Sequence, residues 1–435
     1  MDSYLAILTL TAVRIRRCLV GAVFAGILIG AGSVGFTGLA PVRSALAQEQ
    51  KSTGNTVRPE IGKPIQAALD LLKHKRGKDA LAKVREADAV PNKTPYEAYL
   101  VERVHAQAAS AAGDAAEAAR DFEAIAASSF ANAGEKLQFL GAAAGQYYVA
   151  RNYGKAAELG ARYFKGGGTD KSMHTLYIQA LYLGNDFAAA GKELQSQIQS
   201  EEQAGKTPAE EQLQLLANVY VKLRDNAAYA NVLEQLATYY PKKDYWLALV
   251  DGVAGRPGFS ERLSLDLARL KLATGTMRTA AEYVEAAQLS ILAGLPMEAK
   301  KILDQGYAAG LLGTGPDADR HRRLKDMAAK NLAEDTKTLG QEDAEAAAAK
   351  DGTALLNSGL NYVLHGSADK GLGMMEQGLR KGGMKHPDEA RLHLGYAYHL
   401  AGQNQKAIRV LKTVHGTDGA ASLARLWIIR LGRES

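Results

Sequence analysis

The stretch LHLGYAYHLAGQNQKAIRVL, from Leu392 to Leu411, decides the fold. Its apolar residues recur at helical spacing on both sides of Gly402, which is placed to end one helix before the next begins. Gly395 lies in the first run and Ala407 in the second, and residues this small let two helices pack at a short distance. The stretch therefore predicts two antiparallel helices that cross at Gly395 and Ala407.

The same pattern returns along most of the chain. The residues that correspond to Ala407 in successive units are Ala80, Ala118, Ala156, Ala189, Tyr229, Ala299 and Gly371. Most neighbours in this series are about 33 to 40 residues apart, but two intervals are about twice as long. Each long interval predicts one further, degenerate helix pair, near 244–275 and near 317–350. The sequence thus predicts about ten helix pairs, of which about eight are readable.

This pattern resembles the tetratricopeptide repeat (TPR), a unit of about 34 residues with two antiparallel helices and small residues where they cross. The resemblance implies an all-α fold, an α-solenoid or TPR superhelix in which each pair covers its neighbour's apolar face, over residues 61–416. Residues 417–435 carry an apolar stripe of Leu423, Trp427 and Leu431, so we expect a C-terminal capping helix there. The composition agrees with a folded helical body, because 47% of the residues are hydrophobic and β-branched residues form no alternating runs.

A narrower resemblance rests on segments between residues 180 and 430. The phrases PKKDYW (241–246), RLSLDLARLKLATGTM (262–277) and HPDEARLHLGYAYHLAG (386–402) resemble exported bacterial TPR proteins that accompany TonB-type energy-transduction components. This likeness implies an accessory role in an envelope complex, with a protein or peptide as the partner.

Residues 1–47 differ from the rest of the chain. A basic cluster at 14–17 precedes a long uncharged run, and Ala45 and Ala47 occupy the small-residue positions of an A-x-A site. Together these features predict a signal peptide cleaved after Ala47, hence a periplasmic protein, with a flexible linker over 48–60. The alternative is an uncleaved anchor in the inner membrane with the body facing the periplasm, because the uncharged run is long enough to span a bilayer. Membrane contact is expected only through this segment, if it is uncleaved.

Cysteine content and charge narrow the function classes. Cys18 is the only cysteine, so the mature chain is expected to lack disulfides, a thiol nucleophile and Cys-ligated metal. Cleavage removes four Arg and one Asp, so the formal net charge falls by three from +6 to +3, and no nucleic-acid partner is predicted. The basic turn DRHRRLK at 319–325 is interpreted as a solvated helix face, with an acidic partner or membrane headgroups as the alternative.

None of the short motifs in the sequence supports a catalytic, cofactor-binding or metal-binding site. GAGSVG at 30–35 matches G-x-G-x-x-G and follows an apolar run that could form a strand. A dinucleotide site also needs a helix that opens at the third glycine, a returning strand and a later acid, whereas this motif lies in the segment predicted to be removed and is followed by Pro41 and the cleavage site. SEEQAGKT at 200–207 is half of a phosphate loop, and two acids would face the phosphates, so it is interpreted as a linker between repeats. The 9 histidines include no H-E-x-x-H pair, and no serine lies in G-x-S-x-G. We therefore predict no enzyme activity, no cofactor and no metal site, and interpret His393 as a helix-surface residue.

The TPR resemblance implies that certain positions of each first helix face a concave groove that holds the partner. Carried over to this sequence, these positions are Arg103, Gln107, Gln138, Tyr148, Lys171, His174, Tyr182, Gln214, Asn218, Lys222, Gln288, Glu389, Tyr396 and His399. Asn218 with Lys222 partly resembles the clamp by which some members hold a C-terminal carboxylate, although the matching residues of neighbouring units are missing. As a set, these side chains are polar and aromatic, which suits hydrogen bonding and stacking with a peptide.

The sequence as a whole leads to one expectation and one alternative. We expect a non-enzymatic periplasmic TPR scaffold that binds protein or peptide segments in its groove, as an accessory component of a TonB-type envelope complex. The alternative is a repeat protein of an envelope polysaccharide or export assembly.

Overall fold

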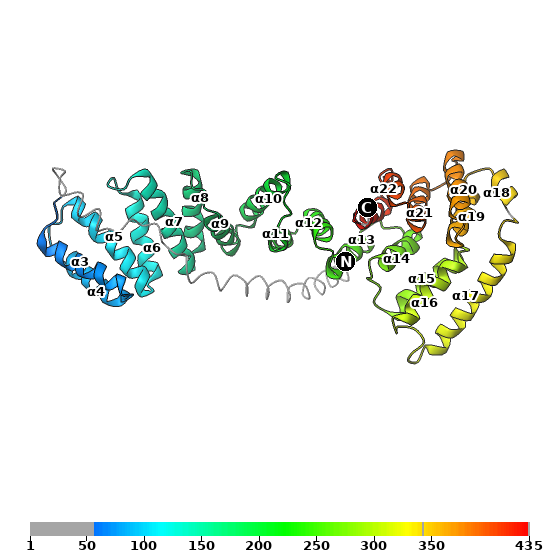
Figure 1. Cartoon of the computed structure of the whole chain (residues 1–435), viewed down its shortest axis with the longest axis horizontal. Helices are drawn as coiled ribbons and strands as arrows, with labels where there is room; N and C mark the ends of the chain where they lie inside the picture. The colour runs from blue at the N-terminus through cyan, green and yellow to red at the C-terminus, as the bar shows by residue number, and fades with distance from the viewer. Residues whose placement is uncertain (1–55, 342, 434–435) are drawn as a thin grey trace. The chain divides into compact units, whose positions relative to one another are not determined.

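The structure is a computed structural model that describes residues 56–341 and 343–433 (Figure 1). All regular structure in these residues is helical, with 21 α-helices, labelled α3 to α23, and no strand. Successive helices pack against one another in pairs. The predicted all-α, α-solenoid class is therefore confirmed.

The described chain forms two compact units, 56–226 and 227–433, which are treated one at a time below. The helices of the N-terminal unit are α3 (Pro59–Lys73), α4 (Gly77–Asp88), α5 (Pro95–Ala112), α6 (Ala115–Ala127), α7 (Ala133–Val149), α8 (Tyr153–Lys165), α9 (Lys171–Leu183), α10 (Phe187–Gln203) and α11 (Glu210–Leu223). Odd-numbered helices are the first helix of each pair in this unit. Among them α3 packs against α5 and α7 against α9, and side-chain contacts join α5 to α7.

The C-terminal unit holds the remaining helices. They are α12 (Asn226–Tyr239, of which only the first residue belongs to the N-terminal unit), α13 (Lys243–Ala254), the short 3-10 helix η2 (Glu261–Leu263), α14 (Ser264–Ala273), α15 (Ala280–Leu292), α16 (Pro296–Ala308), α17 (Ala318–Thr338), α18 (Asp343–Ala348), α19 (Thr353–Leu364), α20 (Ala368–Lys381), α21 (Pro387–Leu400), α22 (Asn404–Leu411) and α23 (Ala420–Leu431). The segments 244–275 and 317–350, which lack the repeat pattern, contain α13 with α14 and α17 with α18.

A left-handed turn residue sets the register of each readable pair. The residues with positive φ between the paired helices are Lys75, Gly113, Arg151, Asn185, Arg224, Gly294, Gly366 and Gly402. Five residues after each of them comes the position corresponding to Ala407, and seven of these eight residues are buried, the exception being Tyr229. In one unit this corrects the sequence-based register from Ala189 to Ala190, which is fully buried. The turn there uses Asn185 (φ 64°) rather than Gly184, because asparagine tolerates the left-handed conformation.

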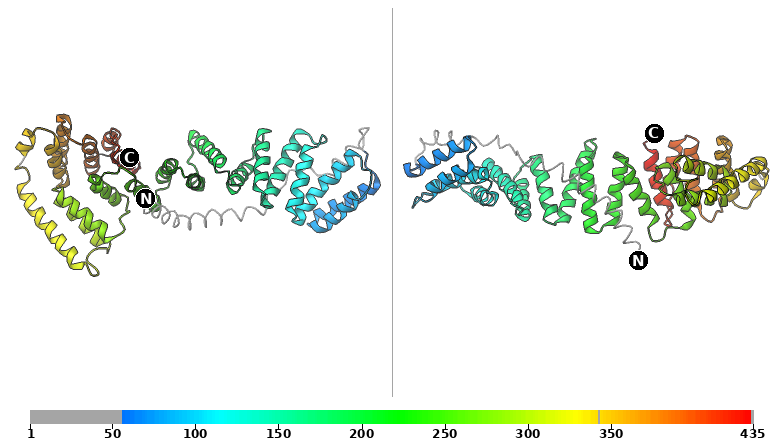
Figure 2. Two further views of the ribbon diagram at one scale, coloured as in Figure 1. Left: turned by 180° about the vertical axis from the view of Figure 1, so that it is seen from behind. Right: turned by 90° about the horizontal axis from the view of Figure 1, so that it is seen from below.

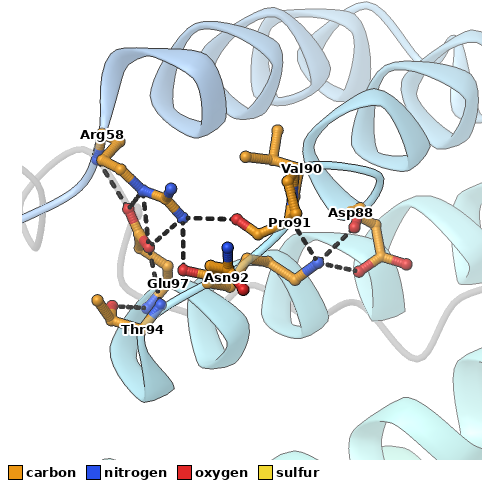
Figure 3. A network of polar contacts seen from close by, with 8 residues as sticks. Arg58, Asp88, Val90, Pro91, Asn92, Thr94 and Glu97 are labelled. Atoms are coloured by element: carbon orange, nitrogen blue, oxygen red, sulfur yellow. Dashed lines mark hydrogen bonds and ion pairs between the residues drawn. The ribbon is translucent and has the colours of Figure 1, made fainter.

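Glu97 fixes the start of the array (Figure 3). Its carboxylate accepts hydrogen bonds from the backbone N of Thr94 (2.9 Å) and the backbone N of Arg58 (2.9 Å). The guanidinium of Arg58 donates to the same carboxylate from Nε (3.0 Å) and Nη2 (2.9 Å). The Thr94 hydroxyl in turn accepts from the Glu97 amide, which completes a capping box at α5. One buried carboxylate thus joins the residue before α3 to the beginning of α5.

Glycines bring α19 and α20 unusually close. A Cβ placed on Gly371 would lie 2.4 Å from the backbone oxygen of Gly359, and one on Gly352 would lie 1.9 Å from that of Gly378. The two helices therefore meet backbone to backbone at two levels, where any side chain would collide.

The C-terminal unit returns on itself. Helix α23 packs against α21 and α22, and also against α13 and α14 at the beginning of the unit (Figures 1 and 2). Leu423, Trp427 and Leu431, the stripe expected on a capping helix, are buried there. The backbone N of Ser260 donates to the carbonyl oxygen of Asp418 (2.9 Å), which ties the two ends of this unit together.

The predicted signal segment 1–47, with Cys18 and the glycines of 30–35, lies outside the described residues, as does most of the predicted linker 48–60. Helix α3 begins at Pro59, two residues before the predicted start of the array. Within 56–341 and 343–433, no helix has both the length and the hydropathy needed to cross a bilayer.

Candidate functional site

In the N-terminal unit, most of the predicted groove residues lie at the surface of the first helices. Gln138, Lys171 and Lys222 are exposed, and Gln107, Tyr148, His174, Tyr182, Gln214 and Asn218 are half-buried. These predicted groove residues on α5, α7, α9 and α11 are called the row below. Hydrogen bonds connect neighbouring first helices beside it: Gln146 of α7 donates to Ser110 of α5 (2.8 Å), and Tyr148 of α7 donates to Gln179 of α9 (3.1 Å). The first helices therefore form a continuous layer from α5 to α9.

Arg103 does not belong to this surface. Its side chain is buried, lies 3.3 Å from a carboxylate oxygen of Glu135, and covers the ring of Phe139 at 5.6 Å. The ion pair and the ring hold α5 against α7, so Arg103 is a packing residue, and the expectation that it faces a groove is not met.

The aromatic members of the row are held by neighbours. The ring of Tyr148 packs edge-on against Tyr153 at 5.5 Å. His174 packs against Phe164 at 5.2 Å and lies 3.3 Å from Glu193. Such contacts fix the orientation of a ring while leaving part of it accessible, which is what a stacking surface needs.

Three of the four amide side chains among these residues have no polar partner in the described chain, whereas that of Gln214 donates to Glu210 (3.2 Å). Among the described residues, the side chains of Gln107, Gln138 and Asn218 make no hydrogen bond or ion pair. Lys222, one turn after Asn218, places its ammonium 5.8 Å from the ring centre of Phe187. A partner's backbone amides would find unsatisfied donors and acceptors on successive helices of this layer.

In the C-terminal unit the corresponding residues are mostly covered. Gln288 is exposed. Tyr396 and His399 pack against the ring of Trp427 in α23, at 5.7 and 5.3 Å. Because α23 folds over α21, these two side chains line an internal contact and not an open groove.

Instead, α21 forms a polar ladder with η2 and α14. The ladder has three rungs, in which Arg262 meets Glu389, Asp266 meets His393, and Arg269 meets Tyr396. The distances are 2.8 Å from Arg262 Nε to Glu389, 3.2 Å from His393 Nε2 to Asp266, and 4.8 Å from the Arg269 guanidinium to the Tyr396 ring centre. Both segments use the spacing i, i+4, i+7, so each presents its three residues on one helix face.

The innermost rung is a fully enclosed ion cluster. Arg269 donates to both oxygens of Glu298 in α16 (2.9 and 2.7 Å) and to Asp266 (2.8 Å), and the Tyr396 hydroxyl also donates to Glu298 (3.0 Å). The side chains of Arg269, Asp266 and Glu298 are only 2 to 4% exposed. Burial opposes ionisation here, yet His393 and Arg269 hold the pKa of Asp266 down at about 2. Burial, together with Glu298, raises the pKa of Tyr396 well above its usual value.

A cavity of about 160 Å³ lies beside this ladder. Its lining is Arg262, Leu265, Asp266, Arg269, Leu289, Ala293, Leu295, Asn357, Leu360, Glu389 and His393. Most of its charged groups already face opposite charges within the protein, so a ligand would have to compete with those ion pairs. The ladder therefore acts first as the connection that holds α14, α16 and α21 together.

Sequence reasoning missed the ladder and misplaced one of its members. His393 was interpreted as a helix-surface residue, but its ring is half-buried against Asp266. The sequence signal is the matching i, i+4, i+7 spacing of residues 262, 266 and 269 and of residues 389, 393 and 396, with opposite charges at 262 and 389. That signal becomes readable once α14 and α21 are known to be neighbours.

The basic turn at 319–325 is partly internal. Arg320, Arg322 and Arg323 are exposed, whereas His321 is buried and accepts a hydrogen bond from the backbone N of Gly313 (3.2 Å). Lys325 lies over the ring of Tyr307 at 4.5 Å. Across the described part of the chain, no group of three His, Cys, Asp or Glu side chains is arranged to hold a metal ion.

Comparisons with known proteins add no identification, because neither a family model nor a curated protein matches this chain.

Proposed function

We propose that the protein is a non-enzymatic scaffold whose N-terminal unit binds an extended segment of another protein across its first helices. The supporting observation is the set of predicted groove residues on α5, α7, α9 and α11. It combines the unpaired amides of Gln107, Gln138 and Asn218 with the rings of Tyr148 and His174, which are held by their neighbours. Successive repeats present this chemistry at regular intervals, which suits a backbone that lies across several units.

The proposal also includes the cellular location of the protein and its role there. The basic cluster, the uncharged run and the A-x-A site of residues 1–47 support export to the periplasm. The resemblance to TPR proteins that accompany TonB-type components supports an accessory role in an envelope complex. The partner is then a protein segment that is exposed in the periplasm.

Site-specific photocrosslinking in cells tests the binding surface. A photoreactive residue at Gln138 or Asn218 should capture a discrete protein partner, identified by mass spectrometry. The matched control is Lys192, which is exposed on α10, the second helix of its pair, and should capture none. Failure to capture any protein above background, or binding of an envelope polysaccharide in its place, contradicts the proposal.

A double substitution tests the residues. Asn218→Ala with Lys222→Ala should weaken binding of the captured partner without lowering thermal stability, because neither side chain lies in the core. Unchanged affinity would remove this pair from the binding surface.

A further inference from the structure

Two aromatic pairs recur where a first helix of the N-terminal unit turns into the second, at an edge formed by residues 148–153, 182–187 and 221–225 and called the turn edge below. Tyr148, in the last turn of α7, packs against Tyr153, the first residue of α8, with ring centres 5.5 Å and planes 67° apart. One repeat of 34 residues later, Tyr182 of α9 packs against Phe187 of α10 at 5.4 Å and 69°. All four rings are half-buried, and Val149 beside Tyr148 is 59% exposed. Two adjacent repeats therefore present the same partly accessible aromatic pair.

Packing within a helix pair does not require these rings. Ser110 and Ala115 occupy the corresponding positions of α5 and α6, and those two helices pack against each other as α7 and α8 do. On α11 the position of the tyrosine holds Val221, which is 42% exposed. The aromatic pairs are thus a feature of two repeats and not of the fold, which is what a surface for binding a partner requires.

The distance between adjacent repeats selects the conformation of a segment that crosses both pairs. Helix α7 packs against α9, and the Tyr148 hydroxyl donates to Gln179 of α9 (3.1 Å). Axes of helices packed in this way are about 8–10 Å apart. A polyproline II helix returns to the same face every three residues, about 9 Å along its axis. In a β-strand the third residue points to the opposite face, so a strand does not present equivalent side chains at this interval.

The turn edge also carries exposed cations. Arg151 and Arg224 occupy the left-handed turn positions, with φ of 61° and 57°, although residues with a side chain adopt this conformation at a cost in free energy. Lys222 lies next to them, 5.8 Å from the ring centre of Phe187. These three cations are exposed and form no ion pair among the described residues.

The acids of the same turns are engaged within the chain. Asp186 accepts a hydrogen bond from the backbone N of Ala189 (3.1 Å), and Asp225 also has a partner. The three cations therefore favour a partner segment that contains acidic residues.

From these pairs and cations we infer that the turn edge binds a polyproline II segment of the partner protein. Proline at every third position faces an aromatic pair, and acidic residues between the prolines face Arg151, Lys222 and Arg224. Proline favours this conformation before binding and packs on aromatic rings, so little entropy is lost when the complex forms. The inference rests on the proposed function, because Tyr148, Tyr182 and Lys222 belong to the row, and it adds the conformation and composition of the bound segment.

Fluorescence anisotropy of labelled twelve-residue peptides with the full chain tests this inference. A peptide of four repeats of Pro-Pro-Glu should bind saturably. Four repeats of Gly-Ser-Glu keep the charge but not the conformation, and four repeats of Pro-Pro-Lys keep the conformation but reverse the charge. Both should bind at least about tenfold more weakly, since each lacks one of the two matched features.

Substitutions then locate the peptide. Arg151→Asn with Arg224→Asn should weaken binding of the Pro-Pro-Glu peptide about tenfold, because two charged contacts are lost. Asparagine tolerates the left-handed turn, as Asn185 shows, so this variant should fold normally. The matched control is Lys75→Asn, an exposed cation at the corresponding turn between α3 and α4 (φ 57°), which should leave the affinity unchanged.

The rings are tested separately. Tyr148→Ser, the residue type found at position 110, should also weaken binding about tenfold, whereas Tyr148→Phe keeps the ring and should bind like the wild type. Circular dichroism verifies the fold of each variant.

The inference is overturned if the Pro-Pro-Glu peptide does not bind saturably at millimolar concentration, or if either control peptide binds as tightly. It is also overturned if the double arginine variant binds like Lys75→Asn. The proposed function is judged independently, because photocrosslinking at Gln138 and Asn218 does not depend on the composition of the partner. A captured protein without binding of the Pro-Pro-Glu peptide would retain the scaffold and remove the polyproline II segment.

Discussion

The guanidinium of Arg269 lies 4.8 Å from the centre of the Tyr396 ring, and the two residues share Glu298 as hydrogen-bond acceptor. This contact joins α14, near the beginning of the C-terminal unit, to α21, near its end. An arginine enclosed in this way depends on its carboxylates, and they depend on it, because no water replaces a lost partner. The closure of the unit thus rests on a few buried charges.

Removing the guanidinium of Arg269 should therefore lower the unfolding free energy of this unit. Arg269→Met leaves Asp266 and Glu298 buried without their cation, and the expected loss is about 3–5 kcal/mol of unfolding free energy. Arg262→Gln is the control, because that rung is about one third exposed and should cost about 1 kcal/mol or less. Urea titration followed by tryptophan fluorescence reports this unit alone, since both tryptophans, Trp246 and Trp427, lie in it. Equal midpoints for the two variants would show that the cluster does not stabilise the unit.

The glycine contact between α19 and α20 makes a second prediction. Gly371→Ala should destabilise the C-terminal unit by about 1–3 kcal/mol, because the added methyl group meets the backbone of Gly359 and the helices must separate. Gly373→Ala in the same helix should stabilise it by about 0.5–1 kcal/mol, because its Cβ meets nothing within 4 Å and alanine favours helix. The same fluorescence-monitored urea titration measures both. Changes of opposite sign in the unfolding free energy would separate the effect of close packing from that of helix propensity. Destabilisation by both substitutions would contradict the role of the close contact at Gly371.

The repeat register could be read from the sequence because the crossing and the turn each impose a residue type. Gly395 and Ala407 are small because two helices meet there, and Gly402 follows because the chain must turn with positive φ. Where asparagine replaced glycine at the turn, at Asn185, the register was read one residue too early. The class of fold therefore followed from local constraints that repeat.

The covered groove and the ladder could not be read in the same way. Tyr396 and His399 occupy groove positions by repeat register, but Trp427 covers them because α23 folds back over α21. The position of α23 over α21 depends on the combined geometry of all the turns between successive helices of this unit. No single segment of the sequence specifies it. Arg103 was assigned to the groove for a related reason, since repeat register does not distinguish a surface cation from one paired with Glu135.

His105 makes the stability of the N-terminal unit depend on pH. Its hydrogen bond to Asp121 (2.7 Å) raises its pKa, with Glu117 adding to the effect and burial opposing it. A raised pKa means that the stabilisation is complete below the unfolded value of about 6.5 and disappears as the pH rises through the folded value. His105→Gln should thus cost most at about pH 5.5 and least at about pH 8.5, measured by hydrogen exchange of the α6 amides corrected for intrinsic rates.

Glu97 should produce the opposite dependence at lower pH. Hydrogen bonds from Arg58 lower the pKa of Glu97 to about 2, against the effect of burial, and the backbone N atoms of Arg58 and Thr94 contribute in the same direction (Figure 3). A lowered pKa means that the stabilisation is complete above the unfolded value of about 4.3 and is lost as the pH falls towards 2. Glu97→Gln cannot titrate, so the difference in protection between wild type and variant at the α5 amides should shrink over this range.

The matched control is Glu86→Gln, whose carboxylate forms an exposed pair with Lys83 (2.7 Å) in the neighbouring helix α4. Exposed pairs contribute little, so this variant should keep the protection of the wild type near neutral pH. If Glu97→Gln also follows the wild type near neutral pH, Arg58 does not fix the start of the array through this carboxylate. If instead protection falls at α3 and α5 together, one buried acid couples the first two helix pairs, because Arg58 precedes α3 and Glu97 begins α5.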